Sequence, residues 1–334
     1  MRRHLIVAGL VLAPVAALTC CVAYDPTQPV KLVGEQALIV WDDATKTQHF
    51  IRQASFQGKA GAFGFVVPTP SVPKVYEADA RLFQRLRDHV DQELDKRRQR
   101  VTGQLTPQAA ASESTAHVIE QYQVGDYLAT IIQASDGDAM LAWLQENGFE
   151  HRPAMVPWFN HYTDKGWYFA ALKFTRKPDS TREETSAIRI TFQTDKPFYP
   201  YKMPSDTWPA RHYRPMNVYF IANAKVTAKF SGSGKPWEAE NEFDGPLGDY
   251  MRHEVQRLAS LQGQDMPRTP VLTSFVNRGN PIGYDEDLEF EQGRPPVHQV
   301  GLYAVGPILL GIGAFAWMNR RRNAPGPPQP NSGP

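Results

Sequence analysis

A histidine and a glutamate stand next to each other in a segment with helical spacing, as in the zinc-binding helix of many hydrolases. In that helix a second histidine follows one turn later, because both imidazoles must reach the same metal. Here His253 and Glu254 are followed by Arg257 at the position of the second histidine. The pattern is incomplete, so the sequence does not predict a zinc hydrolase.

Other residue types that bind metals or carry catalysis are spread along the chain without convergent spacing. His151, His161 and His212 are too scattered to predict one metal site. The acidic run at residues 285–291 lacks the turn glycine and the spacing of a calcium loop. The glycine-serine stretch at residues 231–234 lacks a glycine that a nucleophile elbow requires. We therefore predict no catalytic residue, no metal and no cofactor from these patterns.

Aromatic rings and prolines are concentrated between residues 198 and 213. Exposed rings with polar neighbours can bind a partner, whereas buried rings would pack in the core. The candidate binding surface consists of Tyr201, Trp208 and Tyr213. Trp208 is the best candidate, because its segment lacks strand periodicity and resembles a loop. We expect Trp158 and Tyr199 to be structural.

The N-terminus has the features of a secretory signal peptide, which we assign to residues 1–23. Two arginines precede a short apolar run, and small residues suited to cleavage end at Ala17 and at Ala23. Either site is compatible with the sequence. Cys20 and Cys21 are the only cysteines, so no disulfide can link distant parts of the folded body. Lipidation of one of them is left open.

The C-terminus predicts a single transmembrane helix, from Val300 to Met318. This stretch is uncharged and mostly apolar, and its length suits the hydrocarbon core of a bilayer. Arginines at residues 320–322 predict a cytoplasmic tail over residues 319–334. Residues 284–299 are acidic and proline-containing, and we expect them to form a solvated stalk. The predicted location is the bacterial cytoplasmic membrane, single-pass, with the bulk of the chain in the periplasm.

Between these ends, residues 24–283 are expected to form one extracytoplasmic α+β domain, and a division into two subdomains near residues 150–185 is left open. Stretches rich in apolar residues and bounded by turn residues predict strands at residues 36–41, 49–56 and 62–67, followed by a helix. Hairpins mixed with separate helices favour α+β, with a mixed sheet and packed helices. We expect the first hairpin and the next strand to face this helix, with the following residues in contact: Leu38, Val40, Phe50 and Phe65 against Phe83, Leu86 and Val90.

Several stretches resemble the bacterial domain-of-unknown-function family 2330. They are residues 64–73, 124–127, 134–136, 143–149, 166–174 and 188–192. The resemblance covers about residues 20–220. It implies an exported bacterial protein, often membrane-anchored, and it implies no activity.

The net charge of +1 leaves no electrostatic footprint of a nucleic-acid-binding protein. We expect a membrane-anchored, non-catalytic binding or envelope-assembly module whose partner is an envelope protein or a glycan. The alternative is a cell-envelope hydrolase whose residues come together only in three dimensions. A pocket that gathers titratable side chains would distinguish the two.

Overall fold

A computed structural model describes residues 22–24, 30–58, 62–102, 123–124, 127–149, 151–175, 182–184, 187–207, 216–278 and 285–293. The chain divides into two compact units, Met1–Arg294 and Pro295–Pro334. Within the described ranges no helix is long and apolar enough to cross a membrane. The predicted transmembrane helix at residues 300–318 and the first 21 residues of the predicted signal peptide lie outside the described residues.

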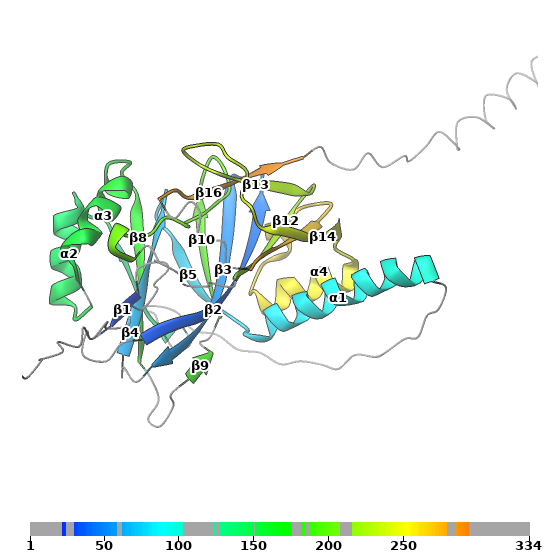
Figure 1. The fold of residues 1–334 in the computed structure, drawn as a ribbon, viewed down its shortest axis with the longest axis horizontal. Helices are drawn as coiled ribbons and strands as arrows, with labels where there is room; N and C mark the ends of the chain where they lie inside the picture. Colours follow the sequence, from blue (N-terminus) through cyan, green and yellow to red (C-terminus); the bar gives the residue numbers. More distant parts are fainter. Residues whose placement is uncertain are drawn as a thin grey trace, which may run out of the picture. The chain divides into compact units, whose positions relative to one another are not determined.

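The centre of the first unit is a mixed sheet in the strand order β14-β15-β12-β2-β3-β10-β5 (Figure 1). Its strands are β2 (Val30–Asp42), β3 (Thr47–Gly58), β5 (Lys74–Ala78), β10 (Ala187–Gln193), β12 (Met216–Ala222), β14 (Glu240–Pro246) and β15 (Val271–Asn277), and β9 (Arg182–Glu184) pairs with β3. β2 and β3 form the predicted hairpin, whereas β12 lies parallel to β2. The α+β fold class is therefore confirmed.

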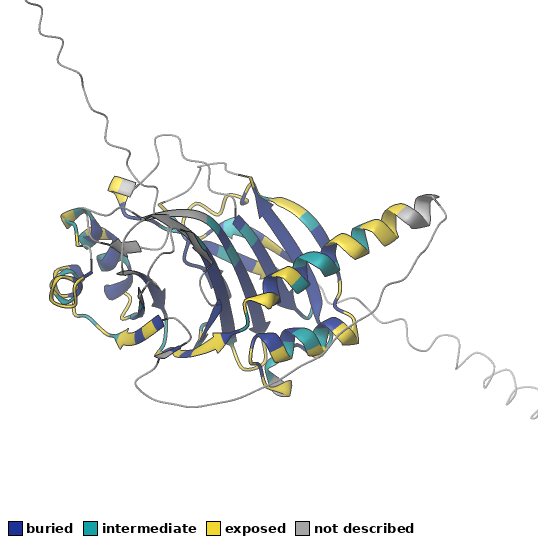
Figure 2. Cartoon of the chain, turned by 90° about the horizontal axis from the view of Figure 1, so that it is seen from below, coloured by how far each residue is buried: buried dark blue, intermediate teal, exposed yellow. Residues whose placement is uncertain are grey.

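Each strand at the middle of this sheet buries both of its faces. On β2, Leu38 and Val40 pack towards α1 (Arg81–Thr102) and α4 (Asp249–Leu258), while Ile39 faces a second core on the opposite side. Figure 2 shows the buried strands beside the two helices, whose outer surfaces are exposed. Strands that are covered on both faces read as continuous apolar runs, as this one does.

One part of the predicted packing is wrong. Leu38 and Val40 do face Leu86, which is fully buried in α1. Phe50 and Phe65 instead belong to the core on the other side of the sheet. The pairing explains the difference, because Phe50 lies opposite Ile39 and not opposite Leu38. Directly opposed residues of two antiparallel strands share a face, so Phe50 points away from α1.

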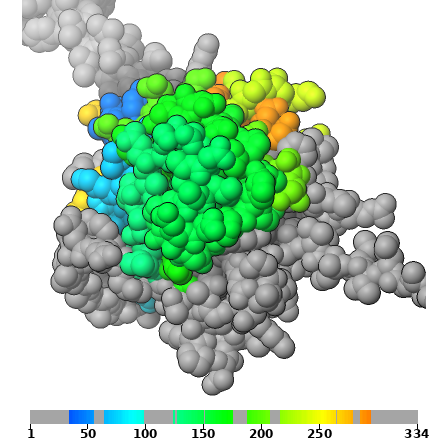
Figure 3. Space-filling model, turned by 90° about the vertical axis from the view of Figure 1, so that its left-hand side faces the viewer, coloured from blue at the N-terminus to red at the C-terminus, as the bar shows by residue number. Residues whose placement is uncertain are grey.

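A second sheet has the order β1-β4-β8-β7-β6 and carries the other helices. Its strands are β1 (Val22–Tyr24), β4 (Ala62–Thr69), β6 (Gln123–Val124), β7 (Tyr127–Ile132) and β8 (Tyr168–Thr175). α2 (Gly137–Glu146) and α3 (Val156–Thr163) pack on it through Met140, Leu144 and Phe159. The side chain of Asp136 caps the start of α2, because it accepts a hydrogen bond from the backbone N–H of Ala139. Residues of these helices form the green face in Figure 3.

The third sheet, β11-β16-β13, corrects the predicted stalk. β16 (Leu288–Gln292) lies between β11 (Phe198–Tyr199) and β13 (Val226–Phe230), so residues 285–293 belong to the folded body. Leu288 and Phe290 are buried, whereas Glu289 and Glu291 pair with lysines at the surface. Alternation of apolar and acidic residues is typical of a half-buried strand, which the acidic composition concealed.

Candidate functional site

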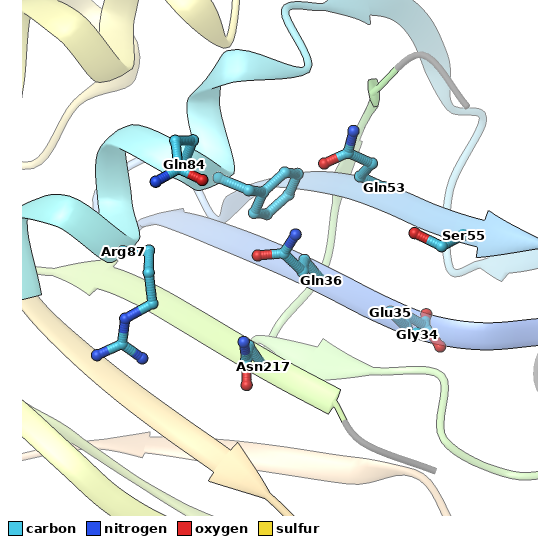
Figure 4. A pocket seen from close by; sticks show the side chains of 9 residues that line it. Gly34, Glu35, Gln36, Gln53, Ser55, Gln84, Arg87 and Asn217 are labelled. Carbon is cyan, nitrogen blue, oxygen red and sulfur yellow. The ribbon is translucent and has the colours of Figure 1, made fainter. Parts of the chain in front are cut away.

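A cavity of about 300 Å³ lies between α1 and the central sheet (Figure 4). Three strands form its floor and the first turns of α1 form its wall. The residues that line it are Gly34, Glu35, Gln36, Gln53, Ser55, Phe83, Gln84, Arg87 and Asn217. Four of these nine residues carry carboxamides, a concentration that distinguishes the cavity from the apolar row of Leu38 and Ile51 beside it.

Three of the carboxamides form a row across the sheet. Gln36 of β2 lies opposite Gln53 of β3 and opposite Asn217 of β12. Side chains in register on neighbouring strands share one face, so the three amides lie side by side. The next row along the strands is apolar, with Leu38 opposite Ile51, and α1 covers it. The polar row therefore begins where the helix no longer covers the sheet.

A glycine makes the floor hollow. Gly34 pairs with Ser55 next to a register shift that begins at Leu32. A Cβ atom built on Gly34 would meet no protein atom within 4 Å. This glycine is not needed for close packing of the protein on itself. Its missing side chain instead leaves space above the sheet.

The charged residues of the lining are compensated by the protein. Arg87 Nη1 donates to Glu242 over 2.7 Å, and Nη2 donates to Asp91 over 2.6 Å. Burial alone would lower the pKa of Arg87, but these two hydrogen bonds outweigh burial and raise it. The carboxylate of Glu35 accepts hydrogen bonds from Arg52 and Tyr199 within the core on the opposite face. The cavity thus presents no uncompensated charge from these residues.

A second polar cluster surrounds Asp287, at the start of β16. Its Oδ1 accepts hydrogen bonds from Tyr162 at 3.0 Å and from the backbone N–H of Lys202 at 3.1 Å. Burial raises the pKa of Asp287. Burial and the nearby charge of Lys165 lower the pKa of His161 to about 4, and the Lys165 ammonium donates to His161 Nε2 over 2.9 Å. These bonds connect α3 to the residue that precedes β16.

A third cluster has the residue types of a nucleophile, a base and an acid. His49 Nδ1 lies 3.0 Å from Thr191 Oγ1, and His49 Nε2 lies 4.0 Å from Asp265 Oδ1. A distance of 4.0 Å is too long for the hydrogen bond that would orient a base. Thr191 sits in β10 between β3 and β5, whose ladders occupy the neighbouring backbone N–H groups. As described, the cluster therefore lacks the oriented base that acyl transfer requires.

A family of uncharacterized proteins conserved in bacteria, DUF2330, matches residues 14–242. The chain belongs to this family. No curated protein matches the chain. Among solved structures, the crystal structure of baculovirus P35 is similar over 82% of this chain and 100% of its own, with 9% identity and a TM-score of 0.44.

All residues that line the cavity lie inside the part of the chain that DUF2330 matches. Asp265 and Asp287, each central to one of the other clusters, lie beyond residue 242. Of the three candidate sites, only the cavity is therefore formed entirely by residues 14–242, the part of the chain that matches DUF2330.

The predicted binding surface is not supported by the described residues. The side chain of Tyr201 is 1% exposed and packs against Tyr199, Phe230 and Trp237, so its assignment to a surface is wrong. Burial of this ring adds apolar area to the core between the sheets. Trp208 and Tyr213 lie outside the described residues.

The structural assignments of Trp158 and Tyr199 are confirmed, because both side chains are buried. Of the scattered histidines, His151 is exposed, His161 joins the Asp287 cluster, and His212 lies outside the described residues. The described part of the chain contains no group of three potential metal ligands. The sequence did not predict the cavity. Its signal is the pair Gln36 and Gln53 on facing strand positions, which becomes visible only when the strand pairing is known.

Proposed function

We propose that this DUF2330 member is an exported, membrane-anchored protein whose folded body binds a ligand in the amide-lined cavity. The observation that carries the proposal is the row formed by Asn217, Gln36 and Gln53 next to the apolar row of Leu38 and Ile51. Pockets with a few convergent polar groups are typical ligand sites, and about 300 Å³ is within their usual size range.

The polar row is difficult to explain by folding alone. Amide groups lose free energy when they leave water without a hydrogen-bond partner, by roughly 1–3 kcal/mol on protein scales. If positions 36 and 217 carried apolar side chains, α1 could pack on this part of the sheet as it packs on Leu38. Both residues are instead half-exposed towards the cavity. Amides held in register by three strands are preorganised for a ligand, which lowers the entropy cost of binding.

Export and anchoring are supported by the two ends of the sequence. The N-terminal arginines and apolar run favour secretion, and the uncharged stretch from Val300 to Met318 favours a membrane span. Cleavage after Ala23 would remove two of the three residues of β1, whereas cleavage after Ala17 would keep this strand. Of the two cleavage sites, we therefore favour Ala17.

Photo-crosslinking in intact cells tests the proposal. A photoreactive amino acid is placed at position 84, which lines the cavity, or at position 92 of the same helix, which is exposed and outside the lining. We expect a crosslinked adduct of defined mass at position 84 only. Adding Gly34→Val should abolish it, because the new side chain enters the space above the floor, where a Cβ atom meets no protein atom within 4 Å. Equal labelling at both positions, or labelling that survives Gly34→Val, would contradict a ligand site in the cavity.

A further inference from the structure

We infer that the ligand of the cavity is an uncharged saccharide unit of a glycan chain. The inference rests on the proposed function, because it names the class of molecule that the same site takes. Three features of the described lining carry it: charge balance, the arrangement of donors and acceptors, and the position of the row inside the sheet.

Charge balance excludes strongly charged ligands. Arg87 forms ion pairs with Glu242 and Asp91, so the charge of its guanidinium is already compensated and is not available to a phosphate or carboxylate of a ligand. Glu35 is paired with Arg52 on the far side of the sheet and offers no carboxylate to a cation. The remaining polar lining consists of four carboxamides and the hydroxyl of Ser55, all of which are neutral.

The lining matches the hydrogen-bonding chemistry of sugars. The carboxamides of Gln36, Gln84 and Asn217, none of which is fully buried, carry N–H donors and carbonyl acceptors, and the hydroxyl of Ser55 can do either. Sugar hydroxyls and acetamido groups likewise donate and accept. Amides on neighbouring strands are about 4.8 Å apart across the sheet, a spacing on the scale of one pyranose ring.

The position of the row disfavours a peptide. Extended peptides usually add to the open edge of a sheet, where unpaired backbone groups supply the affinity. β2 is paired with β12 and β3, and β3 is paired with β2 and β10, so the backbone at the floor is already in use. Only side chains are available to the ligand. A ligand recognised by side chains alone, with many neutral polar groups in a small volume, fits a saccharide better than a peptide.

The test uses the full-length protein, purified in a detergent that has no sugar headgroup. Calorimetry compares tetra-N-acetylchitotetraose, which is uncharged, with its de-N-acetylated counterpart, which carries positive charges. We expect the neutral tetrasaccharide to bind and the charged one to bind about tenfold more weakly or not at all, a difference of about 1.4 kcal/mol or more. Equal affinity for both, or no binding of the neutral one, would overturn the inference.

Variants locate the binding. Gly34→Val and Asn217→Ala should each weaken it by about tenfold or more, whereas Gln92→Ala on the exposed part of α1 should leave it unchanged. Gln84→Ala gives a further lining variant on an exposed helix position, in case a strand variant does not fold. Binding that no lining variant changes would also overturn the inference. If the saccharide does not bind but position 84 still crosslinks a ligand, the proposed function stands and only its saccharide assignment fails.

Discussion

Arg52 donates from Nε to the carboxylate of Glu35 over 2.5 Å, and neither side chain is exposed to solvent. The guanidinium also lies 4.3 Å from the centroid of the Phe65 ring, and the hydroxyl of Tyr199 donates to the same carboxylate. Glu35 stands between Gly34 and Gln36, the residues of the cavity floor. The buried ion pair therefore fixes this floor from the opposite face of the sheet.

Glu35→Gln should destabilise the protein by about 3–5 kcal/mol, because it leaves the charge of Arg52 buried without its carboxylate. The free energy of unfolding in denaturant measures the effect. The matched control is Glu240→Gln, which removes one partner of the exposed pair with Arg278 and should change stability by about 1 kcal/mol or less. Equal losses in the two variants would contradict the importance of burial.

Leu86→Ala should destabilise the protein by about 2–5 kcal/mol, because this side chain is fully buried between α1 and the central sheet. Thermal and denaturant unfolding measure the loss. Leu128 serves as the control, since its side chain on β7 is exposed, and Leu128→Ala should change stability by about 0.5 kcal/mol or less. A loss at position 86 no larger than at position 128 would refute the packing of α1.

Stability should fall as the pH drops below 6.5, because burial lowers the pKa of His49 to about 4. Above pH 6.5 the histidine is neutral in both states. Between pH 6.5 and about 4 only the unfolded chain gains the proton, which costs the fold up to roughly 3 kcal/mol; below that no further loss follows.

Unfolding free energies measured across this pH range test the assignment. His49→Gln should remove the part of the pH dependence that His49 contributes, whereas His161 and His89, whose pKa values burial also lowers, keep their own parts. An unchanged slope in His49→Gln would show that another group is responsible.

Topology gives a prediction for the two ends of the chain. A reporter that is active only outside the cytoplasm should be active when fused after Gly293 and silent when fused after Arg322. The reason is the arginine cluster at residues 320–322, which favours the cytoplasmic side. The reverse pattern, or activity at both positions, would contradict a single span from Val300 to Met318.

Local sequence patterns predicted the individual helices and strands of this fold better than they predicted which strands pair with each other. The hairpin of β2 and β3 and the helix that carries Phe83, Leu86 and Val90 follow from apolar patterns that lie close together in sequence. The parallel pairing of β12 with β2 joins distant segments and has no local signature. The predicted orientation of Phe50 was wrong for a related reason: a shift of one residue in strand pairing moves a side chain to the other face of the sheet.

The site was hidden from sequence reasoning by the same lack of long-range information. Gln36, Gln53 and Asn217 are ordinary polar residues in their own segments, and only the pairing of three strands makes them a row. Aromatic composition pointed instead to Tyr201, whose ring is buried. Composition cannot separate a buried ring from an exposed one, because aromatic side chains supply both cores and binding surfaces.

The parallel pairing of β2 with β12 also sets the order of events during synthesis. Asn217 follows Gln36 by about 180 residues, so the third amide reaches the row only after most of the folded body has been made. Contacts between such distant segments form slowly, because the chain must close a long loop first. An incomplete chain that ends before β12 has two amides and an open strand edge in place of a cavity. Ligand binding would therefore report that the central sheet of an individual molecule has been completed.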